Sequence, residues 1–419
     1  MKKIFLLTGI IILTSIAQGI AQTTEGLTLR ECYQSALKQS ETIAIRQQVI
    51  KEAQARFQQA LSGILPDVSF SYSQKRQDAE GANSLTRYIP EGKFVFSQPL
   101  FTGFKEFAAI SAGKSERRQR QYKEKRARQL LFVDVSDAFY LFLGYQQDLE
   151  ALDIIYNALI ERVEELKKRE ELGRSRLSEV ASAQARLSRV EAEKDLVLSQ
   201  EDVSRQLLEF LTGQKISSLK EEANEEIPLP SYEEYLPALT KRPDVLAGEE
   251  AWKAAQAKIR IAQAAFWPAV SLDGNSYTKR AGTSEGIDWD VTLKVDVPIF
   301  KGGENTGKFK EAEALANEEK LRYEQIKRQA VLNIENEYTK WSAVLRRVSS
   351  LTKAYEAAQK NYELQSADYR LNLVNNLDVL QALQDSQDTH RDLIAVKNEA
   401  QRAYWTFKLS IGEIPYDAF

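Results

Sequence analysis

Histidine and cysteine are almost absent from this sequence. Its 419 residues include one histidine, His390, and one cysteine, Cys32. A single cysteine cannot form an internal disulfide, and a single histidine cannot supply a histidine cluster for a metal ion. We therefore expect a fold held together by packing, with Cys32 as a small buried residue of the first helix and His390 at a solvated helix position.

Signals of an enzyme or of a nucleic-acid-binding protein are also missing. The 57 lysines and arginines are balanced by 60 acids, and the chain has no basic stripe of the kind that nucleic acid requires. It has no Ser–His or Cys–His arrangement, no zinc-ligand spacing and no phosphate-binding glycine loop supported by its context. Gly302-Gly303 lacks the rest of a nucleotide fingerprint and indicates a tight junction between a strand and a helix. We expect no catalytic residues, no cofactor and no nucleic-acid partner.

Long apolar runs are lacking too, apart from one short run near the N-terminus. Lys2-Lys3 precedes the largely apolar residues 4–16, and small residues at 19 and 21 provide a cleavage site. Roughly 13 residues are fewer than the roughly 20 that a membrane-spanning helix needs. We therefore expect residues 1–21 to be a secretory signal peptide, with a retained anchor as the alternative.

The mature chain carries an internal duplication. Pro99-Leu100-Phe101-Thr102-Gly103 recurs as Pro298-Ile299-Phe300-Lys301-Gly302, a shift of 298 − 99 = 199 residues. Self-similarity at a fixed spacing indicates one supersecondary unit used twice. We expect a first repeat over 22–213, a connector over 214–242 and a second repeat over 243–419.

Each half contains a long stretch without proline, at 104–172 and at 304–371. Roughly 69 helical residues at 1.5 Å each would make a rod of roughly 100 Å. A seven-residue repeat runs along the second stretch: Trp341, Val348, Tyr355, Tyr362 and Tyr369. Such a repeat predicts supercoiled packing against neighbouring helices. We therefore expect long antiparallel coiled-coil helices, each followed by a turn and a returning helix.

Two segments, at about 67–101 and about 268–300, have the pattern of β-hairpins. From Ile287 to Val297 apolar residues alternate strictly with polar ones. Roughly 9–11 residues of tilted strand cross a bilayer, and outer-membrane strands alternate lipid-facing with lumen-facing side chains. Four strands cannot close a barrel and lipid does not tolerate open edges, so other copies must complete it, as a dimer with eight strands or a trimer with twelve. A half-buried sheet in a soluble domain has the same alternation, but the long helical stretch between the hairpins weighs against it.

The order of these motifs resembles the TolC-type outer-membrane efflux protein family over essentially the whole mature chain. The resemblance rests on the two Pro-hydrophobic-Phe-x-Gly junctions, on Leu65-Pro66 with Trp267-Pro268, and on Arg242-Pro243-Asp244-Val245. It implies a mainly α fold with a β-barrel part. In a homotrimer, twelve strands would form one outer-membrane barrel above a helical α-barrel that extends into the periplasm. It also implies a periplasmic adaptor protein and an inner-membrane pump as partners.

By the same resemblance, the turns between the paired helices line the periplasmic aperture and receive the adaptor. Six residues occupy the positions of the family's Gly-x-x-Ser motif and of the acid that follows it: Gly173, Arg176, Glu179, Asn372, Asn375 and Asp378. Glu179 and Asp378 are the implied aperture residues, and the other four are the implied adaptor-contact residues. Because arginine and asparagine replace the serines of the motif, we expect the contact with the adaptor to be altered. A ring of three Asp378 carboxylates would favour cations, whereas the alternative for Asp378 is a solvated helix face. Gln381 stands where the family has a second aspartate, which weakens an expectation of cation block.

The sequence therefore predicts a passive exit duct for small molecules, driven by an inner-membrane pump in a tripartite efflux system. The outlet of a type I protein-secretion system uses the same fold and is the first alternative. A periplasmic coiled-coil scaffold without a pore would fit the heptads, but it has no need of the alternation at 287–297.

Overall fold

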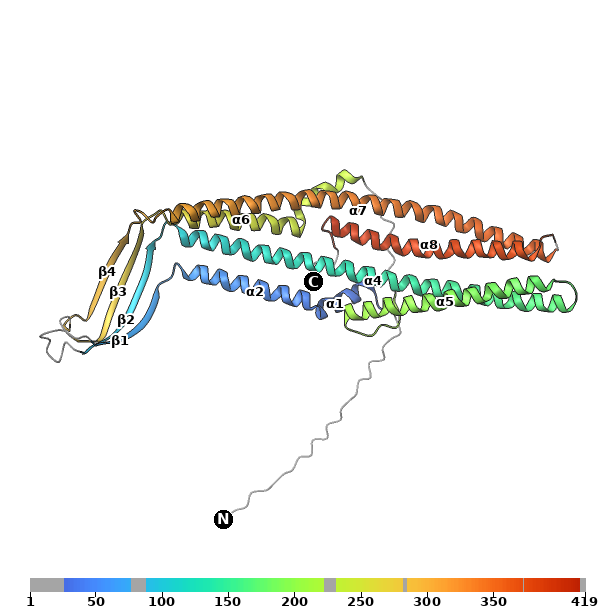
Figure 1. Ribbon diagram of the computed structural model, residues 1–419, viewed down its shortest axis with the longest axis horizontal. Coiled ribbons are helices and arrows are strands. Elements are labelled where there is room, and N and C mark those ends of the chain that lie inside the picture. Colours follow the sequence, from blue (N-terminus) through green and yellow to red (C-terminus); the bar gives the residue numbers. More distant parts are fainter. Residues whose placement is uncertain (1–25, 77–87, 222–230, 282–284, 372, 415–419) are drawn as a thin grey trace, which may run out of the picture.

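The computed structural model describes residues 26–76, 88–221, 231–281, 285–371 and 373–414. It is an elongated layer of helices with a small β-sheet at one end (Figure 1). The predicted fold class, mainly helical with four strands, is confirmed. The expected signal peptide and Asn372 lie outside the described residues. Among the helices of the described ranges, none combines the length and the apolar character needed to cross a membrane.

The two halves of the chain share one order of elements. The first half contains α1 (Leu29–Gln39), α2 (Glu41–Ser62), β1 (Asp67–Arg76), β2 (Tyr88–Phe101), α4 (Lys105–Glu171) and α5 (Leu177–Thr212). The second half contains η1 (Tyr232–Lys241), α6 (Pro243–Ala264), β3 (Ala269–Arg280), β4 (Trp289–Asp296), α7 (Glu304–Arg370) and α8 (Asn376–Ser410). α4 and α7 have 67 residues each, so both run the length of the helical layer (Figure 1).

The shorter helices divide the layer into two parts. From the sheet to the middle of the molecule, α4 packs between α2 and α6, and α6 packs against α7 (Figure 1). From the middle to the far end, α5 packs against α4, and α8 packs against both α4 and α7. The layer is therefore four helices wide along its whole length.

The predicted heptad column of α7 is a packing surface against α8. Trp341 is buried and stacks on Phe407, with ring centroids 5.1 Å apart. Tyr355 stacks in the same way on His390, at 4.5 Å. The expectation that His390 is solvated is therefore wrong: the ring is half-buried, and burial, together with the charge of Lys397, lowers the pKa of His390.

Cys32 is buried in α1, as the sequence predicts. It belongs to the core cluster in which α1 packs on α4, beside Tyr33 and Phe132. Burial, helped by the charge of Glu31, raises the pKa of the Cys32 thiol to about 12. A thiol with so high a pKa is inert at neutral pH, so Cys32 acts as a packing residue.

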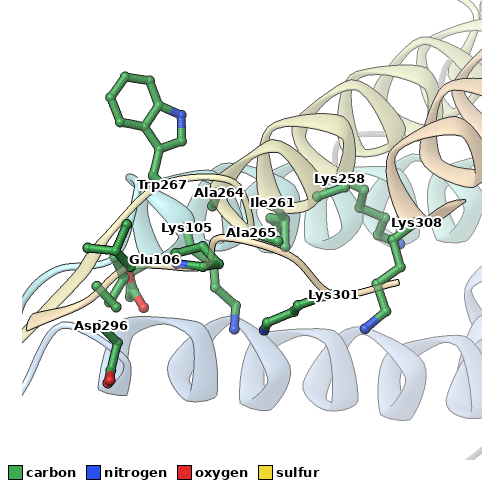
Figure 2. A pocket seen from close by; sticks show the side chains of 15 residues that line it. Lys105, Glu106, Lys258, Ile261, Ala264, Ala265, Trp267, Asp296, Lys301 and Lys308 are labelled. Carbon is green, nitrogen blue, oxygen red and sulfur yellow. The ribbon is translucent and has the colours of Figure 1, made fainter. Parts of the chain in front are cut away.

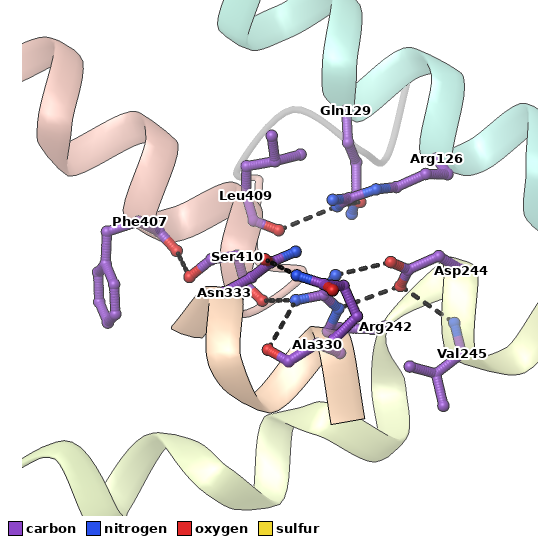
Figure 3. Close-up of polar contacts among 11 residues, drawn as sticks. Arg126, Gln129, Arg242, Asp244, Val245, Ala330, Asn333, Phe407, Leu409 and Ser410 are labelled. Atoms are coloured by element: carbon purple, nitrogen blue, oxygen red, sulfur yellow. Dashed lines mark hydrogen bonds and ion pairs between the residues drawn. The ribbon is translucent and has the colours of Figure 1, made fainter. Parts of the chain in front are cut away.

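Arg242 links α6, α7 and α8 in the middle of the molecule (Figure 3). Its side chain is 1% exposed, and its Nε and Nη2 donate to the two carboxylate oxygens of Asp244 at 3.0 and 2.6 Å. Its Nη1 donates to the carbonyl oxygen of Ser410 at 2.5 Å, at the end of α8. Arg126 of α4 donates to the neighbouring carbonyl of Leu409 at 3.0 Å. Arg242 thus satisfies the carbonyl of Ser410 at the end of α8, and Arg126 adds a second donor to the carbonyl of Leu409, which also accepts the backbone N–H of Gly412 at 3.1 Å.

Candidate functional site

The four strands form one antiparallel sheet in the order β1-β2-β3-β4. β2 and β3 pair directly although they come from different halves of the chain, with Ser97 opposite Asp273. The sheet therefore joins the two repeats at the end of the molecule where the long helices begin (Figure 1).

One face of the sheet is apolar and open. The register places Val68 opposite Phe96 and Phe70 opposite Phe94, and on β3 and β4 it places Leu272 opposite Leu293. Nine side chains of this face are 38–68% exposed: Val68, Phe70, Tyr72, Phe94, Phe96, Trp289, Val291, Leu293 and Val295. An open apolar surface of this extent is a liability in water. It suits contact with lipid hydrocarbon, which an outer-membrane strand meets on alternate residues.

The opposite face of the sheet is polar and internally hydrogen-bonded. Ser97 Oγ donates to Asp273 at 2.5 Å and so links the two hairpins. Asn275 Nδ2 and Tyr277 OH donate to the carboxylate of Asp290 at 2.8 and 2.7 Å. Polar side chains that support one another in this way fit the water-filled side of a barrel wall.

Aromatic rings and glycines mark the junction between sheet and helices. Phe101, the last residue of β2, contacts Trp267 edge-on, with centroids 6.5 Å apart. Gly103 has φ +66°, and a Cβ there would lie 2.9 Å from the carbonyl oxygen of Ala264, so only glycine fits. Gly302-Gly303, the predicted tight junction in the second repeat, is left-handed at both residues, with φ of 58° and 88°.

The first helical turn lies at the end of the molecule opposite the sheet (Figure 1). Gly173 follows α4 in the left-handed conformation, φ +68°, that ends many helices. The carboxylate of Glu179 accepts the backbone N–H of Arg176 at 3.4 Å and the hydroxyl of Ser175. Glu179 therefore caps the start of α5 and is half-buried, while Arg176 is exposed.

The second turn lies at the same end and has a complete capping box (Figure 1). Asn375 Oδ1 accepts the backbone N–H groups of Leu377 and Asp378 at 2.8 and 3.1 Å. The Asp378 carboxylate in return accepts the N–H of Asn375 at 3.3 Å. Asp378 is exposed, so one carboxylate both caps α8 and faces the surroundings of the turn. The structure thus brings five of the six candidate residues to one end of the molecule, and Asn372 lies outside the described residues.

A contact that the sequence did not reveal joins α4 to the start of α8. Arg162 of α4 donates from Nε to Oδ1 of Asn376 at 2.9 Å, and Asn376 is 1% exposed. The guanidinium groups of Arg162 and Arg169 lie 4.0 and 4.7 Å from the ring centroid of Tyr369. These contacts hold α4 against α7 and α8 next to the turns. The heptad pattern indicated Tyr369 as a packing residue, but nothing local in the sequence pointed to Arg162 or Asn376.

Ion pairs continue this seam toward the middle of the molecule. Arg391 of α8 makes two hydrogen bonds with Asp148 of α4, at 2.6 and 3.0 Å, and one with Glu193 of α5, at 2.9 Å. Bidentate pairs fix geometry as well as charge, so Arg391 sets the register of three helices. Over the described ranges of the chain, no group of three or more His, Cys, Asp or Glu side chains is placed to hold a metal ion.

Comparisons with known proteins agree with this architecture. A family model described as "Outer membrane efflux protein" matches residues 32–214 and 236–413. Outer membrane protein TolC of Vibrio cholerae is 23% identical over 366 residues, which cover 84% of this chain and 83% of that protein. Cation efflux system protein CusC of Escherichia coli is 27% identical over 161 residues, 37% of this chain and 35% of that protein.

Solved structures of outer membrane proteins share this fold. The structure of outer membrane protein VceC from Vibrio cholerae matches with a TM-score of 0.79 and 22% identity, covering 92% of this chain and 96% of that one. A structure of CusC matches with a TM-score of 0.80 and 17% identity, covering 94% and 96%. At these identities the structures show that the fold is shared.

Proposed function

The chain belongs to the outer membrane efflux protein family, and from this membership we propose that three copies form the passive exit duct of a tripartite efflux system. The family consists of outer membrane efflux channels and not of enzymes. In the proposed arrangement an inner-membrane pump supplies the energy for export. A periplasmic adaptor connects the pump to the duct, whose helical part extends through the periplasm.

The two-faced sheet is the observation that carries this proposal. Its four strands have an open apolar face and a hydrogen-bonded polar face. Four strands are too few for a barrel, and lipid does not tolerate an open sheet edge. Three copies supply twelve strands, and because four helices continue from each sheet, the same closure forms a helical tunnel beneath the barrel.

The duct is tested by conductance and native mass. We expect the detergent-extracted protein to have the mass of three chains and to give discrete unitary conductance steps in a planar bilayer. A water-soluble species without conductance would contradict the proposal and favour a coiled-coil scaffold.

We further propose that the two turns form the periplasmic mouth of the duct. Glu179 and Asp378 would line the aperture, and Gly173, Arg176, Asn372 and Asn375 would contact the adaptor. The exposure of Asp378 at the start of α8 supports this assignment, as does the position of both turns at the end farthest from the sheet.

Replacement of Asp378 by asparagine tests the aperture. The amide still offers an oxygen to the N–H of Asn375, so the cap persists while three negative charges leave the trimer. We expect the ratio of K⁺ to Cl⁻ permeability, measured from reversal potentials in a KCl gradient, to fall by about twofold or more. Asp385→Asn, one heptad further along α8, is the matched control. Equal shifts from both variants would place the narrowest point elsewhere.

A further inference from the structure

A pocket of about 860 Å³ lies where the strands meet the helices (Figure 2). Its walls come from the ends of α4 and α6 and from the segment that connects β4 to α7. Four of its lining residues are lysines: Lys105, Lys258, Lys301 and Lys308. Only two lining residues are acids, Glu106 and Asp296, so the pocket has an excess of positive charge.

Two of the four lysines form no close ion pair, although Lys301 contributes, after Lys308, to the lowered pKa of Glu304. Lys258 forms an ion pair with Glu116 at 2.6 Å, and Lys308 pairs with Glu304. Within the described part of the chain, no acid oxygen lies within 4.0 Å of the ammonium group of Lys105 or Lys301.

The two acids that line the pocket have different partners. Asp296 forms an ion pair with Lys294 at 2.9 Å, whereas Glu106 accepts the hydroxyl of Thr102 and keeps its negative charge. α4 and α7 both begin beside the pocket, and the N-terminal ends of these two long helices add positive potential. The pocket therefore keeps a net excess of positive charge that an anionic group would neutralise.

Three of the four lysines point to the polar side of the sheet. Thr292, Lys294 and Asp296 occupy every second position of β4 and lie together on its polar face. In Figure 2 the side chains of Lys105, Lys301 and Lys308 extend to the same side as Asp296, whereas the indole of Trp267 points away. In the proposed duct this is the side of the lumen, at the point where the helical tunnel opens into the barrel.

Apolar side chains complete the lining of the pocket. Ile261, Ala262, Ala265 and Val297 contribute to its walls. Its volume falls in the range of small-molecule sites, roughly 300–1,000 Å³, in which an apolar lining holds the body of a ligand and a few polar groups orient it. Free ammonium groups next to such a lining fit a ligand that has an apolar body and one anionic end.

We propose that this pocket binds amphipathic organic anions, with the anionic group between Lys105 and Lys301 and the apolar body on the wall around Ile261. The inference rests on the proposed function, because that function makes this side of the sheet the lumen. It narrows the substrate class: carboxylates, phosphates or sulfonates with an apolar body would pause here on their way out.

The test uses 1-naphthyl phosphate, which carries an aromatic body and a phosphate. Added to the helical-end side of the wild-type channel in a neutral phosphatidylcholine bilayer, it is expected to block the current reversibly, whereas neutral 1-naphthol is not. In the double variant Lys105→Gln/Lys301→Gln we expect the half-blocking concentration to rise about tenfold, because two charged contacts are lost. Lys353→Gln/Lys360→Gln removes the same charge from exposed lysines of α7 and should leave the half-blocking concentration unchanged.

Three results would overturn the inference. The first is equal block of the wild type and the pocket variant. The second is an equal weakening of the block by the control variant Lys353→Gln/Lys360→Gln. In both cases the conductance of the wild type would still support the proposed duct. The third is loss of block when phosphatidylglycerol is added to the bilayer, because the pocket would then hold a membrane lipid and not a solute on its way out. Fluorescence anisotropy of 1-naphthyl phosphate with the detergent-solubilised protein measures binding without a pore. Lysine-dependent binding by a protein that does not conduct would support the pocket and reject the duct.

Discussion

Replacement of Arg242 by alanine should lower the free energy of unfolding by about 3–5 kcal/mol, the usual cost of breaking a buried ion pair from one side. The arginine is 1% exposed and holds both carboxylate oxygens of Asp244 together with the carbonyl of Ser410. Without it, the carboxylate loses its main partner and the end of α8 keeps an unpaired carbonyl. The loss falls where α6 begins and α8 ends, so both parts of the helical layer should weaken together.

Urea unfolding of the detergent-extracted protein, followed by the helical circular dichroism signal, measures this loss. Arg242→Lys keeps the charge but cannot form two parallel bonds to Asp244, so an intermediate loss is expected. Arg205→Ala removes an arginine that pairs with Asp202 on the exposed face of α5, and this control should cost about 0.5 kcal/mol or less. Equal effects of Arg242→Ala and Arg205→Ala would refute the role of Arg242.

The pH dependence of the same pair has a definite sign. Burial raises the pKa of Asp244, but the hydrogen bond from Arg242 and the charge of Arg126 outweigh it, and the net pKa lies below the ordinary 3.8. A carboxylate with a lowered pKa stabilises the fold above its unfolded-state pKa and loses that contribution as pH falls through its folded-state pKa. The difference between the wild type and Arg242→Ala should therefore shrink below about pH 4.

The parts of the fold that depend on local pattern could be predicted from the sequence. The proline-free stretch at 104–172 corresponds to α4 at Lys105–Glu171, because a long helix needs only uninterrupted propensity and a repeating apolar seam. The strict alternation from Ile287 to Val297 corresponds to β4 at Trp289–Asp296, because a strand turns alternate side chains to opposite faces. Each signal lies within one continuous stretch of the sequence.

The contacts between distant helices could not be predicted in this way. Arg242 caps a helix that ends 168 residues later in the chain, and Arg162 meets Asn376 across 214 residues. A polar residue on a coiled-coil helix has the same local pattern whether it faces water or another helix. His390 illustrates the resulting error: we expected a solvated helix position, yet its ring stacks on Tyr355.

Replacement of Leu293 by arginine should prevent stable insertion of the sheet into the membrane. Leu293 lies in the middle of β4 on the apolar face, opposite Leu272. An arginine on the lipid face of a barrel lowers the stability of the folded protein in the membrane by about 2–4 kcal/mol near the bilayer midplane. In the proposed trimer this loss would occur in each of the three copies. We expect the variant to be lost from the outer-membrane fraction and to yield no trimer after extraction.

Thr292→Arg is the matched control for Leu293→Arg, because it introduces the same side chain one residue away on the other face. Thr292 lies opposite Asp273 on the polar face, where an arginine meets a carboxylate and water. Both positions are exposed in the single chain, so exposure alone predicts that the two variants have equal effects. Different effects are expected only if one face of the sheet contacts lipid and the other contacts water. Normal insertion of Thr292→Arg together with loss of Leu293→Arg therefore assigns the apolar face to lipid. Equal tolerance of both variants would show that the sheet does not lie in the membrane, and the physical argument for a barrel built from several chains would then fail.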